Sequence, residues 1–140
     1  MATGLLTEID EQGCLRLLRD SRVGRVVYTE GALPVCTPVN FSLYGATLVV
    51  RTARDSRLAA LANGSIVAFE VDDIDELSHS GWSVLVTGPV DVVRDEATLA
   101  RLAALHIDSW AGEDRDLWIQ IGVARVVGRR LGYPSLDWLI

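Results

Sequence analysis

Short segments rich in valine, isoleucine and tyrosine recur along this chain of 140 residues, separated by turns that contain glycine. Such residues favour extended backbone, and turn signals at short intervals favour antiparallel pairing. The pattern predicts strands at residues 22–29, 33–43, 47–52, 65–71, 82–94 and 117–128. Helical patterns are fewer and cover residues 8–19, 55–62 and 95–107. We therefore expect a mainly β fold, a small closed barrel of six antiparallel strands with flanking α-helices.

Local signals add detail to this outline. We expect Thr7 to cap the first helix and Asp95 the third, because their side-chain oxygens can accept from free backbone amides. The first three strands should form an antiparallel meander. Residues 65–71 form a continuous apolar run, which predicts a strand buried on both faces, and the acidic residues 72–80 predict a polar loop. Gly88-Pro89 predicts a bulge or bend in the fifth strand.

Composition limits the partners and the cellular location that we expect for this chain. The 13 basic residues against 19 acidic ones give a net charge of −6, which argues against a nucleic-acid-binding protein. No apolar run reaches the roughly 18 residues of a membrane-spanning helix, so we expect no membrane partner. The N-terminus lacks the basic and then apolar pattern of a signal peptide. We expect one domain over residues 1–140, located in the cytoplasm.

The most informative stretch for function is VVRTARDSRLAAL, residues 49–61. Here a predicted strand ends in Arg51-Thr52, and a short loop leads to Ser56-Arg57 at the start of a helix. Helix N-termini, hydroxyl groups and guanidinium groups all bind anions, so this arrangement indicates a phosphate site. The alternative is a solvated loop whose arginines pair with the acids at residues 70–76.

Segments elsewhere in the chain agree with this motif in order and spacing. They are Gly24-Arg25-Val26, Pro38-Val39-Asn40-Phe41, Phe69-Glu70-Val71-Asp72, Gly81-Trp82-Ser83-Val84 and the closing segment from Val123 to Arg130. Together with the Arg-Thr and Ser-Arg pairs, this ordered set resembles the pyridoxamine 5′-phosphate oxidase-like family of flavin-binding split barrels, especially its small bacterial members. The resemblance covers roughly residues 8–130 and implies a six-stranded antiparallel split β-barrel.

The resemblance also implies a cofactor, flavin mononucleotide (FMN), and a homodimer with its two flavin sites in the subunit interface. In this family the FMN phosphate binds at the motif matched here by Arg51, Thr52, Ser56 and Arg57. The isoalloxazine ring lies along the strand matched by Pro38, Val39 and Asn40. The partner subunit usually approaches the flavin with the residues matched by Trp82 and Ser83.

The activity implied is two-electron transfer between a reduced nicotinamide and a small acceptor, with the chemistry in the flavin. The sequence identifies no catalytic residue and does not indicate the substrate. The segments that recognise pyridoxal phosphate in true pyridoxamine phosphate oxidases are largely missing from this short chain, so that activity is not implied. Two alternatives remain: a deazaflavin-dependent reductase, and a non-catalytic protein that binds flavin or haem.

Three further features receive plainer interpretations. Five acids lie between Glu70 and Glu76, and we expect a solvated loop there rather than a metal site. His79 follows these acids and could reach a substrate pocket if Trp82 lies near the flavin. Residues 133–140 are apolar for a chain end, so we expect them to dock on the protein's own body or on its partner.

Overall fold

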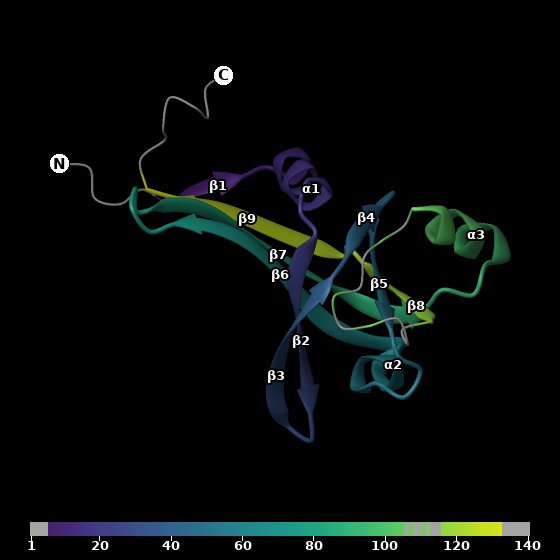
Figure 1. Cartoon of the computed structure of the whole chain (residues 1–140). Helices are drawn as coiled ribbons and strands as arrows, with labels where there is room; N and C mark the ends of the chain where they lie inside the picture. The colour runs from purple at the N-terminus through teal and green to yellow at the C-terminus, as the bar shows by residue number, and fades with distance from the viewer. Residues whose placement is uncertain (1–5, 106, 108–109, 111, 113–115, 133–140) are drawn as a thin grey trace.

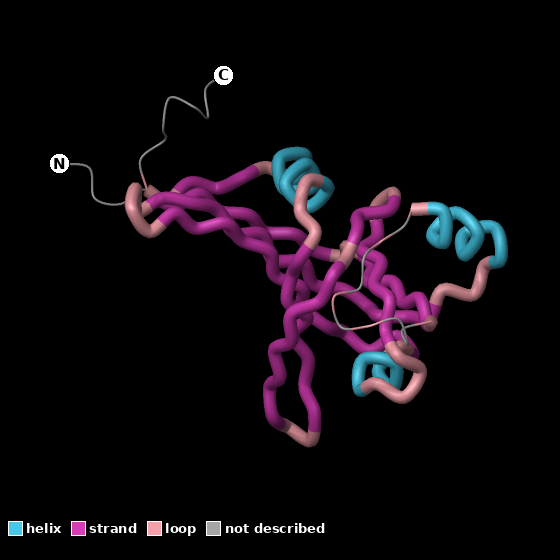
Figure 2. Tube along the Cα trace, in the orientation of Figure 1, coloured by secondary structure: helices cyan, strands magenta, loops and turns pink. Residues whose placement is uncertain are grey.

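The computed structural model describes residues 6–105, 107, 110, 112 and 116–132, and it forms a strongly curved sheet with three short helices (Figures 1 and 2). In chain order the elements are β1 (Thr7–Ile9), α1 (Glu11–Arg19), β2 (Val23–Glu30), β3 (Leu33–Asn40), β4 (Ser42–Tyr44), β5 (Thr47–Thr52), α2 (Arg57–Leu61), β6 (Asn63–Asp75), β7 (Ser80–Val92), α3 (Glu96–Ala104), β8 (Leu117–Gly122) and β9 (Arg125–Leu131). None of the described helices is long and apolar enough to cross a membrane.

Antiparallel pairings run around a closed circuit. β2 pairs with β3, β4 with β5, β5 with β8, β8 with β7, β7 with β6, and β6 again with β2. β3 and β4 together fill the segment that the sequence predicts as one strand, and the chain changes neighbour between them at Phe41. If β3 and β4 are counted as one strand, the circuit has six strands. The prediction of a six-stranded antiparallel split barrel is therefore confirmed.

Two predicted elements differ from the structure because the chain changes partners within them. The expected strand at residues 117–128 is divided into β8, which pairs with β5 and β7, and β9, which pairs with β7 and β1. The expected strand at residues 33–43 is likewise divided, into β3, which pairs with β2, and β4, which pairs with β5, and the predicted meander is present across this break. In both cases the switch of neighbour is a tertiary effect that the local pattern does not contain.

The first helix begins later than predicted. Residues Thr7–Ile9 form β1, which adds to the edge of β9, so Thr7 is not a cap. The Oδ1 atom of Asp10 instead accepts from the backbone N–H of Gly13 at 2.8 Å. At the third helix the prediction is confirmed, because Asp95 Oδ2 accepts from the backbone N–H of Thr98 at 2.9 Å.

The β6–β7 hairpin is longer and more regular than predicted. β6 continues through Asp75, so the expected loop at residues 72–80 is confined to the turn at its end. Its side chains alternate between buried and exposed, and Ile66 is 66% exposed, so the strand is not buried on both faces. Gly88 pairs regularly with Val67, and the bulge lies at the start of β6 instead. A Cβ atom at Gly88 would collide with the carbonyl oxygen of Gly122, which explains the glycine.

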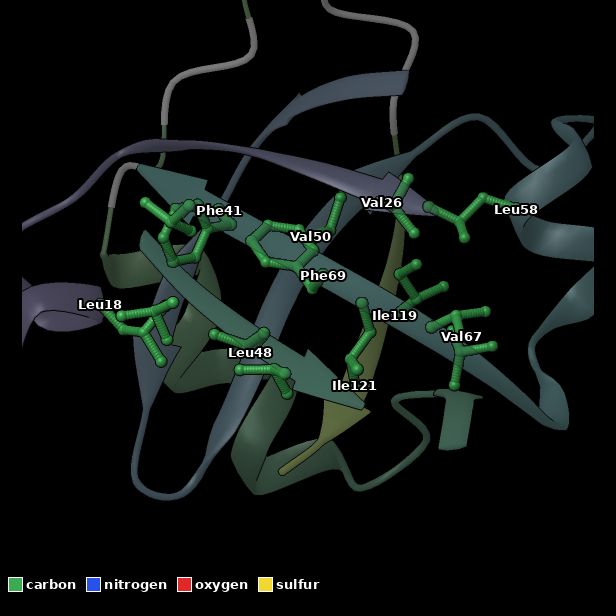
Figure 3. Close-up of a cluster of buried hydrophobic side chains, with 14 of the residues drawn as sticks. Leu18, Val26, Phe41, Leu48, Val50, Leu58, Val67, Phe69, Ile119 and Ile121 are labelled. Carbon is green, nitrogen blue, oxygen red and sulfur yellow. The ribbon is translucent and has the colours of Figure 1, made fainter. Parts of the chain in front are cut away.

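The apolar side chains of the inner faces fill the barrel (Figure 3). The Phe41 and Phe69 rings meet edge to face, with 4.9 Å between their centroids. Leu18 of α1 and Leu58 of α2 lie on opposite sides of this core. A second apolar cluster, Val49, Val93 and Leu102, lies under α3 on the other face of β5.

Candidate functional site

Arg51 lies near the end of β5, on the same face as the α3 cluster. Its Nη1 atom donates to the carbonyl oxygen of Ile107 at 3.4 Å. Its guanidinium carbon lies 5.6 Å from the centre of the Trp118 ring, and Trp118 is its partner in the β5–β8 pairing. Cation–π contact and a carbonyl acceptor therefore orient a half-buried positive charge at this end of the barrel.

Two hydroxyl groups follow Arg51 in the chain, and that of Thr52 points to the opposite face of β5. The Oγ1 atom of Thr52 and the Oγ atom of Ser56 are 2.7 Å apart, and Thr52 is 3% exposed. Ser56 also caps α2, because its Oγ accepts from the backbone N–H of Ala59 at 3.1 Å. α2 spans only Arg57–Leu61, so the helix dipole contributes little to anion binding here. The donor set consists mainly of side chains.

The other arginines of the motif are engaged with acids from different parts of the fold. Arg57 Nη1 lies 3.0 Å from Glu30 Oε1 at the end of β2, and its side chain is 73% exposed. Arg54 Nε lies 3.1 Å from Asp116 Oδ2. No ion pair within the described residues joins these arginines to residues 70–76, so the alternative pairing considered from the sequence is wrong.

The acids near the end of β6 have their own counter-ion. Arg25 Nη1 lies 3.3 Å from Glu70 Oε1 and 3.2 Å from Asp72 Oδ2. Partial burial raises the pKa of Glu70 to about 7, and a hydrogen bond and charge repulsion from Asp72 act in the same direction, against the attraction of Arg25. Among the described residues no group of three or more possible ligands could hold a metal ion.

This carboxyl should make stability depend on pH. Between the ordinary Glu pKa of 4.5 and the folded value of about 7, the folded protein keeps a proton that the unfolded chain releases. The free energy of unfolding should therefore fall as pH rises through this window. The slope of this dependence corresponds to about one proton that the folded protein binds and the unfolded chain does not. Glu70→Gln should remove this slope.

Urea unfolding at a series of pH values between 4.5 and 7 measures this effect. Glu11→Gln, at an exposed carboxylate of α1, is the matched control and should keep the dependence of the natural protein. Equal pH dependence in Glu70→Gln and the natural protein would show that Glu70 titrates alike in the folded and unfolded states.

The β3 residues implicated in ring binding approach the same region. Asn40 ends β3 beside the last residues of β5, and its Oδ1 atom accepts from the backbone N–H of Trp110 at 2.9 Å. Val39 packs against the core and Pro38 is exposed. A pocket of about 400 Å³ opens beside Asn40 and is also lined by Ile107, whose carbonyl accepts from Arg51. Ile107 therefore connects Arg51 to the pocket at the end of β3.

Trp82 and Ser83 lie elsewhere in the chain. Arg51 pairs with Trp118, whose neighbour Ile119 pairs with Val92 at the end of β7. Trp82 is near the other end of the same strand. Because an extended strand rises about 3.3 Å per residue, Trp82 lies about 30 Å from Val92 along β7. His79 lies in the exposed turn next to that far end, with φ of 53°. Within one chain, therefore, neither Trp82 nor His79 reaches Arg51.

The pocket contributes residues that the sequence analysis did not identify. Arg19 and Arg22, on either side of the turn between α1 and β2, both line it. No local motif marks them, because surface arginines are ordinary at the end of a helix. The apolar residues 133–140, which we expect to dock on the protein, lie outside the described part of the chain.

Comparisons with known proteins identify the family of the chain. Residues 10–130 match the family described as pyridoxamine 5′-phosphate oxidase. An uncharacterized protein of Mycobacterium tuberculosis is 33% identical over 131 residues, which cover 90% of this chain and 86% of that protein. The solved structure of an FAD-binding protein from Mycobacterium smegmatis is 31% identical with a TM-score of 0.70, over 90% of this chain and 98% of that one.

A fourth comparison concerns the fold. A candidate pyridoxamine 5′-phosphate oxidase from Corynebacterium glutamicum has a TM-score of 0.80 at 24% identity, over 96% of this chain and 98% of that one. The shared architecture extends over both chains almost completely. On the match of residues 10–130 and the likeness to the mycobacterial relatives, this chain belongs to the pyridoxamine 5′-phosphate oxidase-like family of split-barrel proteins.

Proposed function

We propose that this protein binds FMN, with the phosphate at Arg51, Thr52, Ser56 and Arg57 and the ring along Pro38, Val39 and Asn40. The observation that carries this proposal is the hydroxyl pair of Thr52 and Ser56, 2.7 Å apart, which comes directly after Arg51, whose guanidinium is oriented by Trp118. Hydroxyl and guanidinium donors suit a phosphate monoester, so the residues present fit the group. When bound, the flavin would supply two-electron transfer between a reduced nicotinamide and a small acceptor.

The chain's own residues bind and orient the cofactor. Thr52 is buried, and its hydroxyl bond to Ser56 fixes the position of both donors. Arg57 would leave Glu30 for the phosphate at little loss, because an exposed ion pair contributes 1 kcal/mol or about that at most. Arg51 is held from two sides, so its charge is oriented before the ligand arrives.

FAD is the second candidate cofactor, because the Mycobacterium smegmatis relative that is 31% identical to this chain is an FAD-binding protein. The deazaflavin alternative has a long acidic tail that calls for basic residues beyond the motif, and Arg19 and Arg22, which line the pocket beside Asn40, are such residues. Arg54 and Arg57 form ion pairs with Asp116 and Glu30, and the side chains of both arginines are exposed. FMN needs just one phosphate site, which the Thr52–Ser56 hydroxyl pair of the motif would supply.

The proposal includes a homodimer. Trp82 and Arg51 lie about 30 Å apart along the fold, so a flavin contact from Trp82 requires a second copy of the chain. Two-fold symmetry would then form two equal sites, each with Arg51 from one protomer and Trp82 from the other. Trp82 is half-buried, which leaves part of the indole to cover a ring.

Titration of the apoprotein with three flavins tests the function. FMN should bind and quench flavin fluorescence, and riboflavin should bind about tenfold or more weakly because it lacks the phosphate. FAD binding tighter than FMN would identify the dinucleotide as the cofactor. Equal affinity for FMN and riboflavin would contradict the phosphate site, and a protein that binds no flavin would contradict the proposed function.

A further inference from the structure

The pocket beside Asn40 carries an inference about a second ligand. Its volume of about 400 Å³ lies at the lower end of the range for small-molecule sites. It is bounded by the turn after α1, by the junction of β3 and β4, and by the chain that follows α3. This size suits a molecule of about one ring rather than a dinucleotide.

Charge sets the chemistry of the pocket. Arg19 and Arg22 both line it, and neither forms an ion pair with an acid in the described part of the chain. Asp20 lines it as well, so the described lining residues carry two positive charges and one negative charge, a net charge of +1. In a chain of net charge −6 this is a local site for an anion. A carboxylate would neutralise this net charge, whereas a dianionic phosphate would leave one negative charge uncompensated.

The remaining lining suits a planar body. Leu105 and Trp110, 48% and 74% exposed, provide apolar surface next to the polar groups. The Oδ1 atom of Asn40 already accepts from a backbone N–H, which leaves its amide group as a donor. An aromatic acid could therefore pack its ring on the apolar side and direct its carboxylate to the arginines, which pair well with carboxylates through parallel hydrogen bonds.

The position of the pocket gives this ligand its role. Asn40 belongs both to the pocket and to the strand proposed to carry the flavin ring, and Ile107 joins the pocket to Arg51. We propose that the pocket takes the substrate, a small planar carboxylic acid held by Arg19 and Arg22 beside the flavin. The acid site follows from the pocket itself, and its role as substrate site rests on the proposed flavin binding.

Calorimetric titration of the FMN-loaded protein with benzoate tests the proposal. Benzoate should bind, neutral benzamide should not, and phenyl phosphate should bind more weakly than benzoate. Arg19→Gln and Arg22→Gln should each weaken benzoate binding by about threefold to tenfold. Arg16→Gln, at an exposed position of α1 that does not line the pocket, is the matched control and should leave benzoate binding unchanged.

The flavin affinity of the same variants separates the two proposals. Arg19→Gln and Arg22→Gln should bind FMN as the natural protein does. FMN binding without benzoate binding, equal benzoate affinity in Arg22→Gln and Arg16→Gln, or tighter binding of phenyl phosphate would overturn the carboxylate site while leaving the flavin proposal in place. Competition between benzoate and FMN would show that the pocket holds the flavin ring and would also overturn it. If apoprotein binds benzoate but no flavin, the acid site stands and its role as substrate site fails.

Discussion

Replacing Arg51 with alanine should weaken the binding of FMN about tenfold or more. A charge-assisted hydrogen bond to phosphate contributes on the order of 1.5–3 kcal/mol, and 1.4 kcal/mol is about a tenfold change in affinity. Arg51 is half-buried and oriented by Trp118 and the Ile107 carbonyl, so little of this free energy is lost in ordering the side chain. Fluorescence titration of the apoprotein with FMN measures the change.

Arg94→Ala is the charge-matched control, because Arg94 is exposed and lies in the loop after β7. It should bind FMN as the natural protein does. Riboflavin affinity supplies an internal check, since the loss caused by Arg51→Ala should be much smaller for a flavin without phosphate. Equal losses for FMN and riboflavin would show that Arg51 supports the fold of the site and does not contact the phosphate.

Combining Arg51→Ala and Trp82→Ala chains in one dimer should restore one working flavin site. Each homodimer carries its change in both sites, so both should bind FMN poorly. In the mixed dimer, one site receives an intact Arg51 from one protomer and an intact Trp82 from the other. Co-expression with two affinity tags isolates the mixed dimer, and titration should then give one FMN per dimer.

Sedimentation is the companion measurement, and it should give about twice the chain mass of 15.2 kDa. The Trp82 indole packs partly against the core, so circular dichroism must show that Trp82→Ala retains the fold. A monomer that binds FMN tightly, or a mixed dimer with no recovered site, would remove Trp82 from the flavin site.

Local signals in the sequence predict the elements that carry the phosphate motif. The bounds of β5, Thr47–Thr52, are those that the pattern predicts, and Ser56 caps the next helix at the place where the sequence predicts its start. These features depend on neighbours within a few residues, so the sequence contains them. The six-stranded antiparallel split barrel follows from the resemblance to the split-barrel family and is confirmed by the pairings.

Other features depend on contacts between residues that are far apart in the sequence, and local sequence patterns do not predict such contacts. The break at Phe41 arises because its ring enters the core and meets Phe69, while the chain on either side pairs with different strands. The division between β8 and β9 likewise follows the change of neighbours along β7. The pocket lined by Arg19 and Arg22 exists only when the segments after α1, β3 and α3 come together.

The pairing of β5 with β8 also determines when the site can exist during folding. This ladder joins Thr47 to Gly122, so it closes a long loop of chain, and loop closure over such separations is slow. The β2–β3 and β6–β7 hairpins need only short loops and can form first. On the ribosome, Arg51 emerges well before its ring partner Trp118. The Thr52–Ser56 pair can form locally, but the oriented guanidinium appears only when the barrel closes.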